Sequence, residues 1–146
     1  TDQRKIYMMG MDEGKTIGLQ EVVYLYTPLI PGLKGPGTKM SSSVQNSFIS
    51  IRDKKEVISK KINKAYCKTG DIKNNSILAI TRLIVFPKLN KLDVKRKKEF
   101  GGNIKFNSYE DVEKAFESEK LHAADLKSSV AEAVEKIIAP IRKSWK

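Results

Sequence analysis

Residues 28–37 constrain the fold most, because this segment of ten residues contains three prolines and three glycines. Proline removes a backbone donor and glycine favours irregular conformations, so neither a helix nor a strand should run through the segment. Before it, residues 4–11 read as the end of a helix, and residues 22–26 (Val-Val-Tyr-Leu-Tyr) are typical of a buried strand in a parallel sheet. We therefore predict an α/β piece that ends in a long loop.

Beyond the loop, the apolar spacing changes to that of helices. Asp53 and Glu56 have the spacing of a capping box for a helix over the residues that follow. Further helices are expected to begin near three polar residues: Ser76, Ser108 and Asp125. Pro87 should end the first of these. Residues 92–95 and 104–106 flank a Gly-Gly pair and predict a small hairpin.

Composition indicates a globular protein without a membrane partner. Of the 146 residues, 40% are hydrophobic and 31% are charged. No apolar run approaches the roughly 20 residues of a membrane-spanning helix, and no signal-peptide core follows the N-terminus. The single cysteine, Cys67, excludes an internal disulfide, and we expect it to be a packed thiol rather than a nucleophile. We predict a cytoplasmic location.

Positive charge is concentrated in the middle of the chain. The formal net charge is +11, and residues 52–98 hold 15 basic and 4 acidic side chains, whereas the flanking parts are nearly neutral. Such a patch is typical of proteins that bind polyanions. Lysine-rich helix faces that meet only water would give the same count, so both interpretations stay open.

The tip of the long loop, residues 38–43, reads Thr-Lys-Met-Ser-Ser-Ser. One cation and three hydroxyls in a polar loop indicate phosphate handling. The segment is not a P-loop, because Thr38 separates Gly37 from Lys39, and Met40 separates Lys39 from the first serine.

This tip resembles the Lys-Met-Ser-Lys-Ser signature of class I aminoacyl-tRNA synthetases, in its Lys-Met-Ser-Ser-Ser form. The resemblance to the tyrosyl-tRNA synthetases of archaeal and eukaryotic type extends over essentially the whole chain. It rests on six further segments: residues 2–6, 27–33, 64–67, 100–103, 125–127 and 139–143. These favour the tyrosine enzymes over the related tryptophanyl-tRNA synthetases, which remain the alternative within the class.

The resemblance implies a fold of two parts. Residues 1–50 would be the C-terminal remnant of a Rossmann-type catalytic domain that carries the loop. Residues 51–146 would be a helical anticodon-binding domain with a small β-hairpin.

The resemblance also implies the chemistry of tyrosine activation, with ATP and Mg²⁺ as a substrate complex and neither a tightly bound cofactor nor a resident metal. Lys39 would neutralise charge on the leaving pyrophosphate, and Met40 would hold the adenine side through its backbone. Gln3 would hydrogen-bond the tyrosine substrate. The remaining donors to the phosphates would be three hydroxyls: Ser41, Ser42 and Ser43.

For tRNA(Tyr), the resemblance implies that Phe100 stacks on the first anticodon base and that Asp125 accepts hydrogen bonds from that guanine. His122 would lie close to the same nucleotide. Phosphates of the anticodon stem would meet a run of four cations: Lys95, Arg96, Lys97 and Lys98. Without the resemblance, Phe100 reads as a core residue and Asp125 as a helix N-cap.

The chain departs from a complete synthetase of this class. The class needs a His-Ile-Gly-His motif, and His122 is the only histidine. One strand cannot form a sheet, so we expect an upstream portion or another chain to complete the catalytic domain and to make the full-length homodimer. We predict that the chain alone is inactive. The alternative is a free-standing tRNA-binding module or a fragment without catalytic activity.

Overall fold

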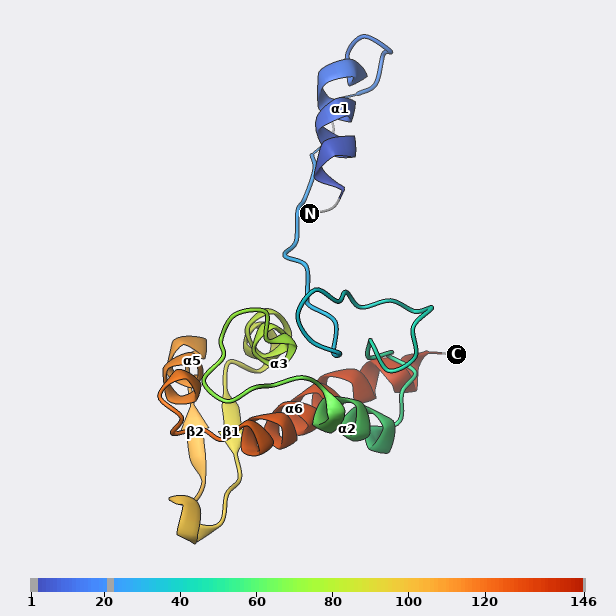
Figure 1. The fold of residues 1–146 in the computed structure, drawn as a ribbon. Helices are drawn as coiled ribbons and strands as arrows, with labels where there is room; N and C mark the ends of the chain where they lie inside the picture. Colours follow the sequence, from blue (N-terminus) through green and yellow to red (C-terminus); the bar gives the residue numbers. More distant parts are fainter. Residues whose placement is uncertain (1–2, 21–22, 146) are drawn as a thin grey trace.

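The computed structural model describes residues 3–20 and 23–145. Helix α1 (Arg4–Gly14) stands apart from the rest, to which it is joined by an extended segment (Figure 1). The other elements follow the long loop. They are α2 (Lys55–Lys64), α3 (Ser76–Ile80), η1 (Thr81–Val85), α4 (Phe86–Leu89), β1 (Leu92–Val94), η2 (Lys98–Phe100), β2 (Ile104–Phe106), α5 (Tyr109–Glu117) and α6 (Ala123–Ser144).

The core of the helical module forms around α6, the longest helix, which lies along α2 (Figure 1). Its buried residues Leu126, Val130 and Val134 recur every four positions, as expected for one face of a helix. Ile58 and Ile62 of α2 are fully buried against them. The predicted helical module is therefore confirmed. Among the residues that the structure describes, none of the helices is long and apolar enough to cross a bilayer.

The predicted hairpin is also confirmed. Strands β1 and β2 pair antiparallel, with Leu92 opposite Phe106 and Val94 opposite Ile104. Its connection contains η2 and turns at Gly101, whose φ of 90° is a left-handed conformation that side-chain-bearing residues rarely adopt. The loop of the hairpin thus projects at one end of the helical module.

Three predicted helix boundaries are wrong. Helix α2 has no side-chain cap, because the Asp53 carboxylate accepts instead from the Ser50 N–H, at 2.9 Å. Asn75, not Ser76, caps α3. The helical run passes through Pro87, because the preceding π-turn in η1 accommodates a residue without an N–H.

The predicted strand at residues 22–26 is wrong as far as the structure describes it; residue 22 lies outside the described residues. Residues 23–26 form no strand, and the side chains of Val23 and Leu25 are each 86% exposed. A strand needs a neighbour for its backbone hydrogen bonds, and the described residues offer none beside it. The division at residue 50 stays a prediction, since Leu33 belongs to the same buried cluster as the helices.

Candidate functional site

The long loop closes on itself at a narrow neck. Pro31 and Lys39 form an isolated antiparallel bridge, and the Gly32 N–H donates to the Thr38 carbonyl at 2.9 Å. A Cβ at Gly32 would lie 2.6 Å from Thr38 Oγ1 and 2.9 Å from the Lys39 backbone. Only glycine fits this close approach, so the neck depends on it.

Ser47 is the polar centre of the loop and was missed by sequence reasoning. Its side chain is buried, and its hydroxyl lies 2.8 Å from both the Ser41 and Val44 carbonyls while accepting from the Ser41 N–H. The Leu33 N–H donates to the Ser47 carbonyl at 3.2 Å. The base of the loop is therefore ordered by its own hydrogen bonds, and Leu33 anchors it in the core.

The residues of the tip face outward. Lys39, Ser42 and Ser43 are exposed, whereas Met40 is half-buried against the core. The hydroxyls of Ser41 and Ser43 lie 2.8 Å apart. Among residues 3–20 and 23–145, no carboxylate forms an ion pair with Lys39. The ammonium and hydroxyls are thus available to an anion.

Gln3 does not meet the loop tip in this structure. It lies exposed just before α1. The pocket beside α1, of about 350 Å³, is lined in part by Gly10, Met11 and Tyr24, and Gln3 is not among its lining residues. The predicted tyrosine contact therefore stays a prediction.

Phe100 lies at the tip of the hairpin loop with its side chain 64% exposed. Its interpretation as a core residue is wrong, because the loop projects beyond the packed helices (Figure 1). An exposed aromatic ring on a turned loop is suited to stacking on an unpaired base.

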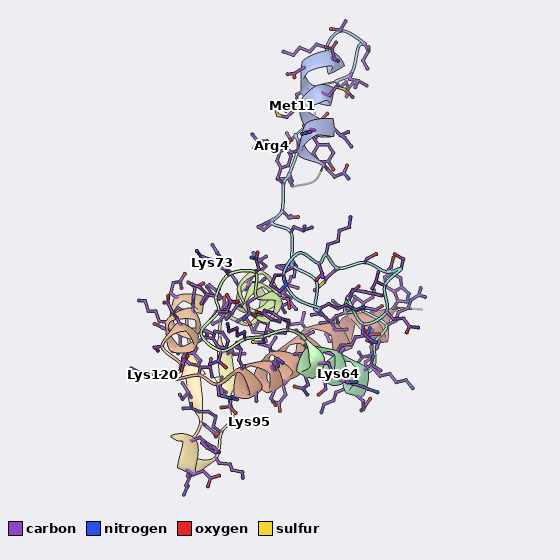
Figure 2. The ribbon with its side chains drawn as sticks, in the orientation of Figure 1. Arg4, Met11, Lys64, Lys73, Lys95 and Lys120 are labelled. Atoms are coloured by element: carbon purple, nitrogen blue, oxygen red, sulfur yellow. The ribbon has the colours of Figure 1, made fainter. Side chains whose placement is uncertain are left out.

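The cations of residues 95–98 differ in the contacts that they make within the chain. Arg96 makes three hydrogen bonds: its N–H donates to Asn103 Oδ1 at 3.0 Å, and its guanidinium donates to the Gly102 and Lys120 carbonyls at 3.1 and 3.0 Å. The bond to Lys120 joins the hairpin loop to the α5–α6 connection, and Figure 2 shows Lys95 and Lys120 on the hairpin side of the module.

Two of the lysines in this run have acidic partners. Lys95 Nζ lies 2.8 Å from Glu132 Oε2, and this hydrogen bond raises the pKa of Lys95. Lys97 Nζ lies 3.4 Å from Glu99 Oε1. All four groups of these pairs are more than half exposed, so the pairs are weak and could yield to phosphates. Lys98 is exposed as well.

His122 and Asp125 lie at the start of α6. His122 is the N-cap, and its Nδ1 accepts from the Ala124 N–H at 3.2 Å. Asp125 is in the first turn and half-buried, so its interpretation as the N-cap is wrong. A carboxylate there is favoured by the helix dipole and remains available as an acceptor.

Cys67 is partly buried and packs against the core. Burial raises the pKa of its thiol, and Asn75 donates to its Sγ at 3.5 Å. Because the thiolate is the nucleophilic form, a raised pKa disfavours such a role. The prediction of a packed thiol is confirmed.

Comparison with known proteins agrees with these features. Residues 1–139 match the family described as tRNA synthetases class I (W and Y). The chain is 44% identical over 142 residues to a tyrosine–tRNA ligase of Methanosarcina barkeri, covering 97% of this chain and 44% of that protein. A cytoplasmic tyrosine–tRNA ligase of Danio rerio is 38% identical over 144 residues, covering 99% of this chain and 27% of that protein.

Solved structures point the same way. The tyrosyl-tRNA synthetase of Archaeoglobus fulgidus, complexed with L-tyrosine, superposes with a TM-score of 0.89 at 39% identity, covering 97% of this chain and 44% of that chain. A tryptophanyl-tRNA synthetase of Giardia lamblia reaches a TM-score of 0.68 at 24% identity, covering 99% of this chain and 34% of that chain, and so shares only the fold.

The chain thus spans less than half the length of the relatives that it matches. The resemblance predicted from the sequence is confirmed, with the tryptophan alternative less supported. The chain belongs to the class I tRNA synthetases of the tryptophan and tyrosine family, and within that family it is similar to the tyrosine–tRNA ligases.

Proposed function

We propose that the chain is part of a tyrosine–tRNA ligase, to which it contributes the ATP loop and the surface that reads the anticodon. The observation that carries the proposal is the exposed Phe100 on a braced hairpin loop, in a chain whose relatives are tyrosine–tRNA ligases. In this proposal residues 1–50 belong to the catalytic domain and residues 51–146 bind the anticodon.

In the proposed reaction, the carboxylate of tyrosine attacks the α-phosphate of ATP, and pyrophosphate leaves to give tyrosyl-adenylate. A hydroxyl at the 3′ end of tRNA(Tyr) then attacks the tyrosyl carbonyl, and AMP leaves. The ammonium of Lys39 neutralises the charge that develops on the leaving pyrophosphate. Donors aimed at charge that appears only in the transition state raise the rate by about 10²–10³ each. The three serine hydroxyls of the tip donate to the same phosphates, and Met40 supports the adenine. Gln3 binds the tyrosine.

Mg²⁺ enters this proposal with the substrate. The described residues contain no group of three or more acidic, histidine or cysteine side chains placed to hold a metal ion. We infer that Mg²⁺ arrives bound to the phosphates of ATP, as Mg²⁺ commonly does.

The remainder of the ligase would cover the apolar surface around α1. Ile17, Val23 and Leu25 are each more than 70% exposed, and exposed apolar patches of this kind mark interaction sites. Because the relatives are more than twice as long, we propose that their additional part packs here, completes the sheet and provides the homodimer contact. A cytoplasmic location is proposed from the name of the Danio rerio relative.

The test is anticodon-dependent binding of tRNA(Tyr) by the chain. Phe100→Ala and Asp125→Ala should each weaken binding by about 1–3 kcal/mol, since each removes a stacking or base-edge contact. Trp145→Ala is the control, because Trp145 is also an exposed aromatic residue but lies at the far end of α6. Wild-type binding by both site variants would refute the anticodon assignment.

A free-standing tRNA-binding module is the second candidate. It is favoured by the buried core of the helical module, which runs from Ile58 to Ile138 and takes only Leu33 from the described part of residues 1–50. Both candidates predict the same tRNA binding, so they are separated by catalysis: only the ligase part should restore tyrosine-dependent exchange when it is combined with the missing half.

A further inference from the structure

A basic pocket lies between the base of the long loop and α2. It has a volume of about 460 Å³ and is lined by Lys34 and Asn46 from the loop, and by Lys60, Lys61 and Lys64 from α2. The helix residues recur three and four positions apart, so they share one face. The floor is apolar and includes the buried Leu33 and Ala65.

One of the four lysines is already neutralised. Lys61 Nζ lies 2.6 Å from Asp53 Oδ2, both side chains are largely buried, and the ammonium also lies 4.9 Å from the ring centroid of Phe48. This ion pair is structural and holds the residues before α2 against it. It leaves the other three lysines as the excess charge of the pocket.

Lys34, Lys60 and Lys64 are exposed, and none of them has an ion-pair partner in the described part of the chain. Glu56 lies one turn before Lys60 on α2 but is not paired with it. Lysines near the C-terminus of a helix stabilise its dipole, which would account for Lys64. It does not account for Lys34, which comes from a different segment.

The two walls of the pocket are fixed relative to each other. The Tyr66 N–H, just beyond α2, donates to the Leu33 carbonyl at 2.8 Å. A Cβ at Gly35 would lie 3.1 Å from the Tyr66 ring, so the loop base packs closely on that ring. The backbone at Lys34 is therefore held beside α2 before any ligand binds, which lowers the entropy cost of binding.

We propose that this pocket binds a backbone phosphate of the tRNA, at a position between the anticodon surface and the loop that carries Lys39. Three lysines from two segments, none of them ion-paired within residues 3–20 and 23–145, converge on one cavity, and a phosphodiester supplies the matching charge. The bound phosphate contacts the base of the loop, so tRNA binding stabilises the segment that acts on ATP. The proposal rests on the proposed function.

The test compares two double variants that each remove two positive charges. Lys60→Gln/Lys64→Gln changes the pocket, and Lys88→Gln/Lys114→Gln changes two exposed lysines outside it. The probes are a tRNA(Tyr) transcript and the same transcript with a changed anticodon, titrated at several salt concentrations. Circular dichroism and a thermal melt check that both variants fold.

The pocket variant should reduce the slope of log K against log salt by about 1, because one phosphate is no longer neutralised, whereas the control should leave the slope close to wild type. The loss should be the same for both transcripts, because phosphate contacts carry no sequence information. Lys34→Gln, a change in the loop, should reduce the salt slope by half as much as the pocket variant does. If Lys60→Gln/Lys64→Gln does not fold, Lys34→Gln is used in its place.

Equal slopes for the pocket and control variants would overturn the proposal. So would a pocket variant that binds tRNA normally but binds ATP more weakly, since the phosphate would then belong to the nucleotide. The proposed function fails separately: if Phe100→Ala binds like wild type while the pocket variant does not, the anticodon assignment is wrong and the pocket stands.

Discussion

The hydrogen bonds of Arg96 within the chain are not predicted by its neighbours in the sequence. It stands in a run of four cations, and the run as a whole was predicted to hold phosphates. In the structure its backbone N–H and two of its guanidinium N–H groups donate to Asn103, Gly102 and Lys120. The first two bonds lie within the loop that carries Phe100, and the third fastens that loop to the segment before α6. We infer that Arg96 positions Phe100.

We expect Arg96→Gln to weaken binding of tRNA(Tyr) by about as much as Phe100→Ala, about 1–3 kcal/mol, because the ring is no longer held for stacking. The two changes should be clearly non-additive in a double-mutant cycle, since they remove the same interaction. Calorimetric titration with tRNA(Tyr) and with an anticodon-changed transcript measures both effects.

Lys98 is the matched control for Arg96. It is the exposed cation two residues on, and Lys98→Gln should lower the salt slope by about 1 without changing discrimination between the two transcripts. If Arg96→Gln behaves in the same way, Arg96 contacts a phosphate and the positioning role is wrong.

The long loop is the element whose structure departs most from a simple irregular segment. The neck of the loop is closed by the Pro31–Lys39 bridge. Beyond the neck, the backbone of Ser41 and Val44 is hydrogen-bonded to the buried side chain of Ser47. The tip therefore emerges from a fixed base. This arrangement restricts the positions that the ammonium of Lys39 can reach. The placement of Lys39 therefore depends on the residues at the base of the loop as much as on the signature residues at its tip.

Gly32→Ala should disturb this base, since the added Cβ would lie 2.9 Å from the Lys39 backbone and must push the strands of the neck apart. In the reassembled ligase we expect ATP–pyrophosphate exchange to fall by about 10²-fold, the usual effect of misplacing a catalytic group by about 1 Å. Binding of tRNA(Tyr) should change less than twofold, because the anticodon surface lies elsewhere.

Pro36→Ala is the control within the same loop, since Pro36 is exposed and lies outside the neck. It should leave exchange close to wild type. Equal losses in the two variants would mean that general loosening of the loop, and not the closed neck, governs the position of Lys39.

At the scale of the whole molecule, the chain consists of a packed helical module and an N-terminal part with little core. Of the residues before the loop that the structure describes, only Gly14 is buried. Hydrophobic side chains this exposed are costly to leave in water. The N-terminal part thus exposes apolar side chains that the described residues do not cover, whereas the helical module has a buried core.

We expect the chain by itself to show no tyrosine-dependent ATP–pyrophosphate exchange, because it contains one histidine and lacks the histidine motif that the class uses for ATP phosphates. Mixing it with the half that carries this motif should restore exchange, and Lys39→Ala should then lower the rate by about 10²–10³. Isotopic exchange measures both.

Lys114→Ala, at an exposed lysine of α5, is the control for Lys39→Ala and should retain the restored rate. Exchange by the chain alone would contradict the need for a second half. Restored exchange that is insensitive to Lys39→Ala would remove Lys39 from the reaction.

Much of this protein follows from local patterns in the sequence. The apolar spacing in residues 126–138 predicts α6, and the Gly-Gly pair between two short apolar runs predicts the hairpin, because periodicity and turn chemistry act over a few residues. The tip of the loop and Phe100 were also singled out, as members of a motif whose order along the chain is specific.

Only the tertiary structure decided which polar groups are used up and which are free. It placed Arg96 in a hydrogen-bonded brace and Lys61 in an ion pair, and it brought Lys34 into one pocket with Lys60 and Lys64 of α2, all three of which are exposed. It also left residues 23–26 without a strand partner. These outcomes depend on side-chain contacts outside the repeat of any helix or strand, some of them between distant segments such as Arg96 with Lys120, so no local pattern encodes them.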